Sequence, residues 1–419
     1  MDTELLTLIA LNWAEFAVRW LHVITAIAWI GSSFYFIALD LGLRRDRKLE
    51  TGADGEEWQV HGGGFYHIQK YLVAPASLPE HLTWFKWESY ATWMSGFALM
   101  VLVYYLGADL YLIDLNKAEL SAAAGIGISL ASIVLGWVGY SMLCRSKLGE
   151  NATALMVVLY LIIVALAWGF DQVFTGRAAF LHLGAITATI MSANVFMVII
   201  PNQKIVVADL KAGKTPDAKY GKIAKQRSTH NNYLTLPVIF LMLSNHYPLA
   251  FGGQFSWVIA SLVFLMGVTI RHYFNTVHAR GGNPRWTWAA TAALFLAIIA
   301  LSLAPLMQET EIDENAGWET DSLTGQASLL AQHPDFQSVT DVVMGRCSMC
   351  HAAEPFYEGV RWAPKGVVLE TPVQIATFAE SIVLQSALSH AMPPANVSYM
   401  EDEERKLIRR WYQDSLNRP

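Results

Sequence analysis

Two cysteines and a histidine near the end of the chain form its most specific chemical motif. Two residues separate Cys347 from Cys350, and His351 follows directly. This Cys-x-x-Cys-His pattern is the attachment signature of a c-type haem, in which the histidine binds one face of the iron. A zinc or redox pair is the alternative, but zinc needs two further ligands, and no other Cys lies in this half of the chain. The motif therefore predicts a covalent haem c and an oxidising compartment.

Met392 is the expected second ligand of that iron. It lies in Ala391-Met392-Pro393-Pro394, and the prolines restrict the backbone just after the thioether. His390 is the competing distal ligand, while Met344, Met349 and Met400 are less suited by position. A methionine ligand raises the haem potential, which suits an acceptor of electrons from an organic substrate.

The composition excludes an ordinary soluble enzyme. Hydrophobic residues make up 54% of the 419 residues and charged residues only 15%, as in polytopic membrane proteins. Nothing indicates nucleic-acid binding. Cys144 is the one further cysteine, so no disulfide framework is expected. The first 15 residues contain no Lys or Arg, and we therefore expect no cleavable signal peptide.

Hydropathy predicts an all-α fold, with eight membrane spans followed by a small helical domain similar to class I cytochromes c. Each span has about 20 apolar residues, the length that a bilayer requires. The spans are expected near residues 15–39, 90–112, 121–144, 152–170, 179–201, 232–250, 255–277 and 286–306.

Loop charges predict the orientation. Loops 40–89, 145–151, 202–231 and 278–285 together contain 17 Lys and Arg residues, whereas the alternate loops contain only Lys117 and Arg177. The positive-inside rule then places both termini outside the cytoplasm. We expect a multi-pass protein of the bacterial inner membrane, in contact with lipid, with its cytochrome domain in the periplasm, where c-type haem is attached.

Three regions follow along the chain. Residues 1–306 are the membrane domain, 307–333 an acidic periplasmic linker and 334–419 the cytochrome domain. The linker is polar and lacks apolar periodicity. Its acidic residues are Glu309, Glu311, Asp313, Glu314, Glu319 and Asp321. In the last region, the candidate core positions are Ile375, Phe378, Ile382, Leu388, Leu407, Ile408 and Trp411.

Two membrane histidines suggest a further cofactor. His22 in the first span and His182 in the fifth share a Leu-His context followed by Thr-Ala, which indicates a parallel repeat of two four-span halves. They would then lie at the same depth and could bind a b-type haem between them. The alternative is that each imidazole bonds a backbone carbonyl or a nearby hydroxyl.

A polar cluster on the cytoplasmic side is the candidate catalytic site. It combines His230 and Asn231, which enter the sixth span, with Arg271 in the seventh. Residues 61–67, His-Gly-Gly-Gly-Phe-Tyr-His, could bring backbone N–H groups to a ligand. Arg271 can grip an anion, and His230 is the candidate general base. The alternative is that positive charge here only sets topology.

Taken together, the chain resembles the bacterial membrane-bound urate oxidase family, whose members join eight spans to a C-terminal cytochrome c. The resemblance rests on residues 19–22, 29–31, 62–66, 194–196, 201–203 and 229–233, with the haem motif and Met392 also present. It implies oxidation of urate to 5-hydroxyisourate, with water as the oxygen source. The haem c would take the electrons and pass them to a soluble cytochrome c or a terminal oxidase.

Two other functions fit the sequence. One is a quinol or other respiratory dehydrogenase with a fused cytochrome, which would need a quinone pocket at mid-membrane depth. The other is a non-enzymatic membrane protein that handles haem or copper. Copper handling predicts Met-rich outer loops, and segments 113–120, 171–178 and 251–254 contain no Met.

Overall fold

The computed structural model describes residues 3–46, 48–71, 78–114, 117–304, 320, 323–358, 360 and 362–416. The chain divides into two compact units. The larger comprises residues 15–307, and the smaller comprises 1–14 with 308–419. Most of the predicted acidic linker, including its six acidic residues, lies outside the described residues.

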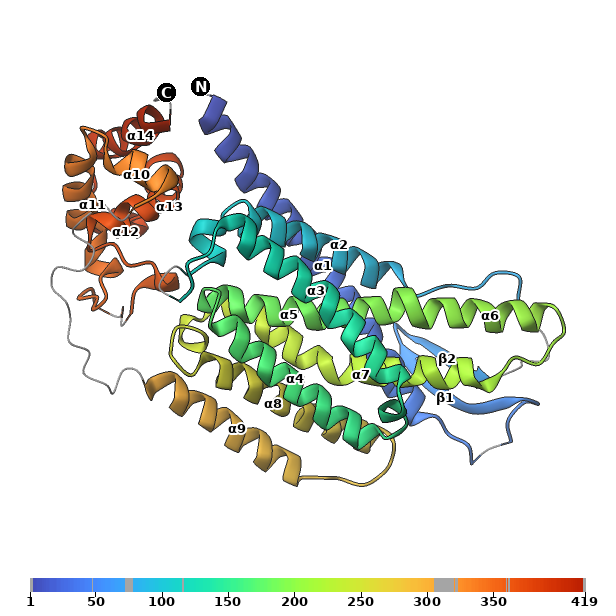
Figure 1. Ribbon diagram of the computed structural model, residues 1–419. Helices are drawn as coiled ribbons and strands as arrows, with labels where there is room; N and C mark the ends of the chain where they lie inside the picture. Colours follow the sequence, from blue (N-terminus) through green and yellow to red (C-terminus); the bar gives the residue numbers. More distant parts are fainter. Residues whose placement is uncertain are drawn as a thin grey trace. The chain divides into compact units, whose positions relative to one another are not determined.

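Long helices build the larger unit (Figure 1). Six of the described helices are long and apolar enough to cross a membrane: Leu6–Gly42 of α1, α3, α4, α5 with α6, α8 and α9. Their bounds are α1 Thr3–Gly42, α3 Ala122–Arg145, α4 Ala152–Asp171, α5 Gly176–Ala193, α6 Ile200–Lys211, α8 Ser256–His278 and α9 Trp286–Leu303.

The two other predicted spans have a different character. α2 (Trp87–Met100) continues through two short π-helical segments, Val101–Tyr105 and Ala108–Leu112, and so is broken. α7 (Ala218–Leu243) is continuous, but its first half is strongly polar. The loop expected at 202–231 is largely helical. A π-helical segment, Asn194–Ile199, joins α5 to α6 without a break, and α7 begins already at Ala218.

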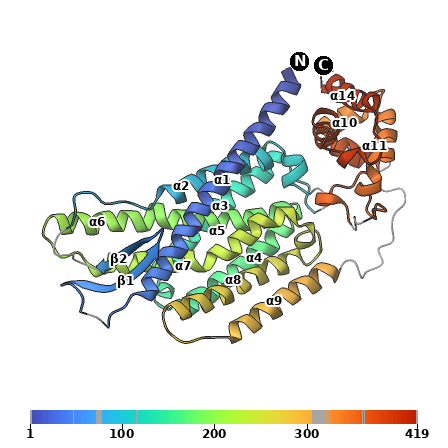
Figure 2. The ribbon, with the colours of Figure 1, turned by 180° about the vertical axis from the view of Figure 1, so that it is seen from behind.

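A β-hairpin interrupts the all-α pattern in the first loop. β1 (Ala53–His61) pairs antiparallel with β2 (Gly64–Tyr71). Gly62 and Gly63 connect them with φ of 59° and 79°, the left-handed conformations that a two-residue hairpin turn requires. The hairpin turn thus accounts for these two glycines, and their contact with a ligand stays a prediction. Figures 1 and 2 both show the hairpin at the same end of the unit as α6.

α5 forms the centre of the larger unit, and its side chains Phe180, Leu183 and Ile186 belong to the main buried cluster. Neighbouring helices approach closely where glycines allow it. A Cβ added to Gly267 of α8 would lie 2.5 Å from the ring of Pro237 in α7. Since no real Cβ contact is that short, only a glycine at position 267 leaves room for the proline of α7.

The smaller unit is helical, as expected, but its helix Gly325–Ala331 lies within the predicted linker 307–333, and its Leu330 belongs to the buried core. Its helices are α10 Gly325–Ala331, α11 Phe336–His351, α12 Pro372–Thr377, α13 Ala379–Ile382 and α14 Asp402–Leu416. Trp411 of α14 is fully buried and stacks on Phe336 at a centroid distance of 5.9 Å. Ile375, Ile382 and Ile408 are buried with it, which confirms these predicted core positions.

Candidate functional site

A buried polar network joins α3, α7 and the π-helical segment after α5. Asn194 donates through Nδ2 to the hydroxyl of Tyr140 at 3.0 Å and to Oδ1 of Asn231 at 2.9 Å. Arg227 donates to Oδ1 of Asn194 at 3.4 Å, and its guanidinium lies 4.9 Å from the centroid of the Tyr140 ring. The Tyr140 hydroxyl lies 2.8 Å from Nδ1 of His230.

Local structure explains why these side chains meet. Arg227, His230 and Asn231 are three and four residues apart on α7, so they share one face of the helix. Asn194 is the first residue of the π-helical segment, and such wide turns change the direction of side chains at functional sites. Tyr140 lies on α3 and is 4% exposed. Tyr140 was not predicted as a site residue, because no local signal marks it.

The contact between Tyr140 and His230 suits proton transfer. The Tyr140 hydroxyl accepts from Nδ2 of Asn194 and has a proton that it can donate to Nδ1 of His230. With that direction, Nδ1 is the basic nitrogen of a neutral His230 and can receive a proton through Tyr140. The role of His230 as a general base stays a prediction.

Arg271 belongs to a second network. Its Nε donates to Oδ1 of Asn232 at 3.3 Å and its Nη2 to Oδ1 of Asn275 at 3.1 Å. The guanidinium lies 4.3 Å from the centroid of the Phe34 ring. The predicted trio is thus divided: His230 and Asn231 share one network, and Arg271 joins the next residue, Asn232.

Buried positive charge is the main electrostatic feature. Arg227 is 2% exposed and Arg271 is 6% exposed. Within the described residues, neither forms an ion pair with a carboxylate. In addition, Nε of Arg227 and Nδ2 of Asn232 are buried donors that find no acceptor in the part of the chain that the structure describes. Buried charges and donors are normally satisfied, so this region suits an anion rich in acceptor atoms.

A cavity of about 1200 Å³ reaches this network. Its walls are mainly apolar side chains of α3, α4, α5, α7 and α8, and Tyr140 and His230 contribute polar groups to it. Leu135, Met142 and Val157 on its walls are exposed, so the cavity is open along an apolar side. A ligand could therefore reach the Tyr140–His230 pair from that side.

His182 has no nitrogen free for an iron. Its Nδ1 donates to the carbonyl of Ala178 at 2.8 Å, and its Nε2 lies 2.7 Å from the hydroxyl of Ser129. It is fully buried among aromatic rings, including Phe174 at a centroid distance of 4.8 Å. This arrangement is the alternative of a hydrogen-bonded core histidine, and it argues against the predicted pairing with His22.

In the smaller unit, the motif residues have a geometry that fits a haem. His351 ends α11 and donates from Nδ1 to the carbonyl of Val367 at 2.8 Å, which leaves Nε2 for an iron. Cys347 and Cys350 are free thiols. Burial raises the pKa of the Cys347 thiol to about 12, so an unmodified Cys347 stays neutral near pH 7. Cys347 packs against the apolar core of this unit, as a cysteine joined to a buried macrocycle would.

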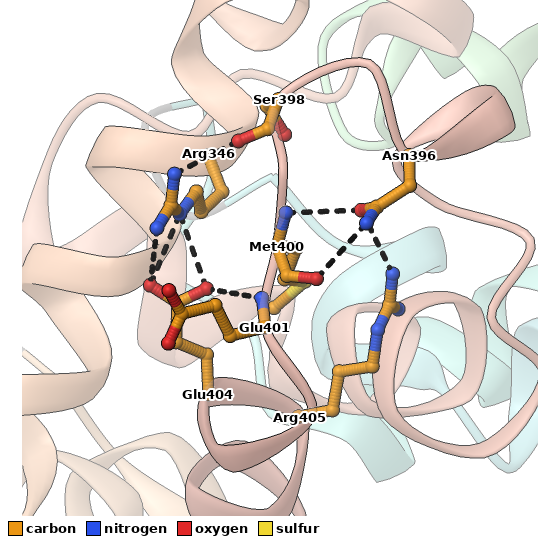
Figure 3. Close-up of polar contacts among 7 residues, drawn as sticks. All are labelled: Arg346, Asn396, Ser398, Met400, Glu401, Glu404 and Arg405. Atoms are coloured by element: carbon orange, nitrogen blue, oxygen red, sulfur yellow. Dashed lines mark hydrogen bonds and ion pairs between the residues drawn. The ribbon is translucent and has the colours of Figure 1, made fainter.

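Arg405 of α14 holds the segment that carries Met392. It is 6% exposed and donates to the carbonyls of Ser386 and Met392, the second at 2.9 Å. It also donates to Oδ1 of Asn396, whose side chain bonds the backbone of Met400 at both N–H and C=O (Figure 3). Met400 itself is buried in the core, and the side chain of His390 is exposed. Of these candidates for the distal ligand, Met392 remains the best placed.

These features define a class: a mainly helical protein with membrane-compatible helices and a buried, cationic polar site. The family comparison is more specific. A family model described as urate oxidase N-terminal matches residues 8–302, and the chain belongs to this family. No curated protein matches it, and no solved structure does so either.

Proposed function

We propose that this protein is a membrane-bound urate oxidase that passes electrons to its own haem c. The observation that carries the proposal is the pair of buried guanidinium groups, Arg227 and Arg271, which have no carboxylate partner among the described residues. Family membership supports urate as the substrate. Urate is a planar anion near neutral pH with several carbonyl acceptors, which matches the unpaired donors of Arg227 and Asn232.

The reaction balances with water as the second reactant. Urate and water give 5-hydroxyisourate, two protons and two electrons: a C–O bond forms at C5, and its oxygen comes from water. Arg227 and Asn232 would hold the anion by hydrogen bonds. The Tyr140–His230 pair would take one proton, moving it from the Tyr140 oxygen to Nδ1 of His230.

Haem c would supply a one-electron acceptor, and a two-electron oxidation must then proceed in two steps or use two carriers. Cys347 and Cys350 would attach it, and His351 and Met392 would bind its iron. We place the eight spans in the bacterial inner membrane with both termini in the periplasm. A soluble cytochrome c or a terminal oxidase would then receive the electrons.

The large apolar cavity favours one second candidate, a quinol dehydrogenase, because an apolar pocket that ends in a tyrosine–histidine pair also suits a quinol headgroup. Both candidates predict reduction of the haem, but by different compounds.

One experiment separates them. Purified, oxidised protein receives urate or a short-chain quinol under anaerobic conditions, and the α-band of the haem is followed. Reduction by urate, with 5-hydroxyisourate formed, is the expected result. Reduction by quinol alone would establish the second candidate, and an unchanged spectrum with urate would disprove the first.

A further inference from the structure

A second cavity, of about 230 Å³, lies outside the cluster around Arg227. Side chains of α1, α2, α5 and the segment that ends α7 line it. Both cavities are lined by two imidazoles and by aromatic rings, but only this one also has two guanidinium groups. The residues that matter below are Arg19, His22, Trp29, Trp93, Phe97, Tyr104, Arg177, Asn245 and His246.

His22 is prepared to act as a ligand. Its Nδ1 lies 3.0 Å from the carbonyl of Thr92 and 3.2 Å from the hydroxyl of Ser95. A carbonyl only accepts, so Nδ1 carries the proton and the lone pair of Nε2 is free. Histidines that bind metals are usually oriented in this way, through a carbonyl on the other nitrogen.

Gly96 provides the space for this imidazole. A Cβ added at Gly96 would lie 2.8 Å from Cε1 of His22. The ring therefore packs against the backbone of α2 at a position where any larger residue would displace it. His22 is thus held both by a hydrogen bond and by its packing.

His246 contributes the second imidazole of the cavity. It ends the short 3₁₀ turn Ser244–His246, which directly follows α7. Asn245 in the same turn accepts hydrogen bonds from Tyr104 at 3.2 Å and from Arg177 at 3.2 Å. The turn is therefore fixed against α5 and the segment after α2, while His246 makes no side-chain hydrogen bond within the described residues.

The remaining lining indicates a flat ligand with an anionic edge. Arg177 lies over the rings of Tyr104 and Tyr111 and has no carboxylate partner among the described residues. Arg19, in contrast, is already paired with Glu15. The rings of Trp93 and Phe97 stack on each other at a centroid distance of 5.5 Å, so the cavity has aromatic walls.

We propose that this cavity binds a b-type haem through His22 and His246, with Arg177 beside its propionates. A bare metal ion is a poorer occupant, because the described residues contain no group of three side chains that could hold one. Val23 and Leu243 line the cavity and are exposed, so an extended macrocycle can project between the helices. The site does not depend on the identity of the substrate.

Pyridine haemochrome spectra of the purified full-length protein test the proposal. We expect b-type and c-type haem in equal amounts, with only the b-type extracted by acidified acetone. His22→Ala and His246→Ala should each lose the b-type spectrum and keep the c-type. His182→Ala is the matched control, because it removes a buried membrane histidine outside the cavity, and it should keep both.

Two results would overturn the proposal: a pure c-type spectrum of the unaltered protein, or b-type haem lost in His182→Ala but kept in both other variants. His22→Met and His246→Met test whether the alanine variants lose the b-type haem only because they misfold. Methionine is also an axial ligand, so these variants should keep the b-type haem with a changed potential. Loss of urate oxidation with the b-type haem intact would disprove only the proposed function.

Discussion

Arg405 donates a hydrogen bond to the carbonyl of Met392, and the two atoms lie 2.9 Å apart. This contact joins the last helix of the chain to the residue expected to bind the iron. Arg405 is buried, and its other acceptors, Ser386 and Asn396, lie on either side of Met392 in the sequence. The guanidinium therefore fixes the backbone on both sides of the thioether.

Substituting Arg405 with Gln should weaken methionine ligation. The shorter amide cannot reach all three acceptors, and losing a buried charged hydrogen bond costs about 1.5–3 kcal/mol. We expect loss of the methionine–iron charge-transfer band and a lower reduction potential, measured by redox titration. Arg405→Lys should restore part of both.

Arg346→Gln is the control for this substitution. Arg346 lies in the same region and donates to Glu404 and to the carbonyl of Ser398 (Figure 3). Its hydrogen bonds within the described residues do not include Met392. The Arg346→Gln variant should leave the charge-transfer band unchanged. An equal loss of the band in both variants would mean that Arg405 acts only through general stability.

Arg227→Gln should impair urate binding. The proposed charged hydrogen bond is worth about 1.5–3 kcal/mol, which corresponds to a rise in KM of roughly 10- to 150-fold. Lys222→Gln is the matched control, because it removes the same charge from an exposed position of the same helix. A similar KM for both variants would contradict anion binding at Arg227.

Tyr140→Phe should slow the chemical step more than it weakens binding. The substitution removes the hydroxyl between Asn194 and His230 but keeps the ring against Arg227. General acid–base catalysis contributes about 10²–10⁴-fold, so kcat should fall within that range while the haem c spectrum stays unchanged. Rapid-mixing kinetics of haem reduction would measure it, and an unaltered rate would exclude the proposed proton route.

The ion pair of Glu404 with Arg346 predicts a pH dependence of stability in the smaller unit. Burial raises the pKa of Glu404, but the hydrogen bonds from Arg346 and from the Glu401 N–H outweigh it, so the pKa is lowered overall. A pKa that is lower in the folded than in the unfolded protein gives a contribution to stability that is complete above the ordinary pKa of Glu. This contribution is lost as the pH falls through the folded-state pKa. The thermal unfolding temperature of this unit, followed by the haem c spectrum, should therefore fall below about pH 4. Glu404→Gln should show a flatter profile, and an identical acid loss would contradict this account.

Periodicity and composition were sufficient for much of the fold. Helices α1, α3, α4, α8 and α9 overlap the predicted spans, because twenty apolar residues in sequence leave little choice of structure. The hairpin was missed because its strands alternate weakly and are partly exposed. The continuation of α6 beyond residue 201 was missed because the polar and basic residues there suggested a loop.

The site was predicted less completely than the fold. His230 and Asn231 belong to one network because Tyr140 and Asn194 link their side chains. Tyr140 comes from a distant helix with no motif around it, and only the tertiary structure brings it to His230. His182 resembled a haem ligand by its sequence context, but its Nε2 is occupied by the hydroxyl of Ser129 on another helix, which no local spacing identifies.

The contact of Pro237 with Gly267 predicts that these two positions change together among relatives. A side chain at position 267 and a proline at position 237 exclude each other sterically, so relatives that lose one should be free to lose the other. Gly267→Ala should destabilise the protein, and Pro237→Ala should suppress that defect in the double mutant. Sequences of relatives would then show these two positions changing together, as a record of this helix contact.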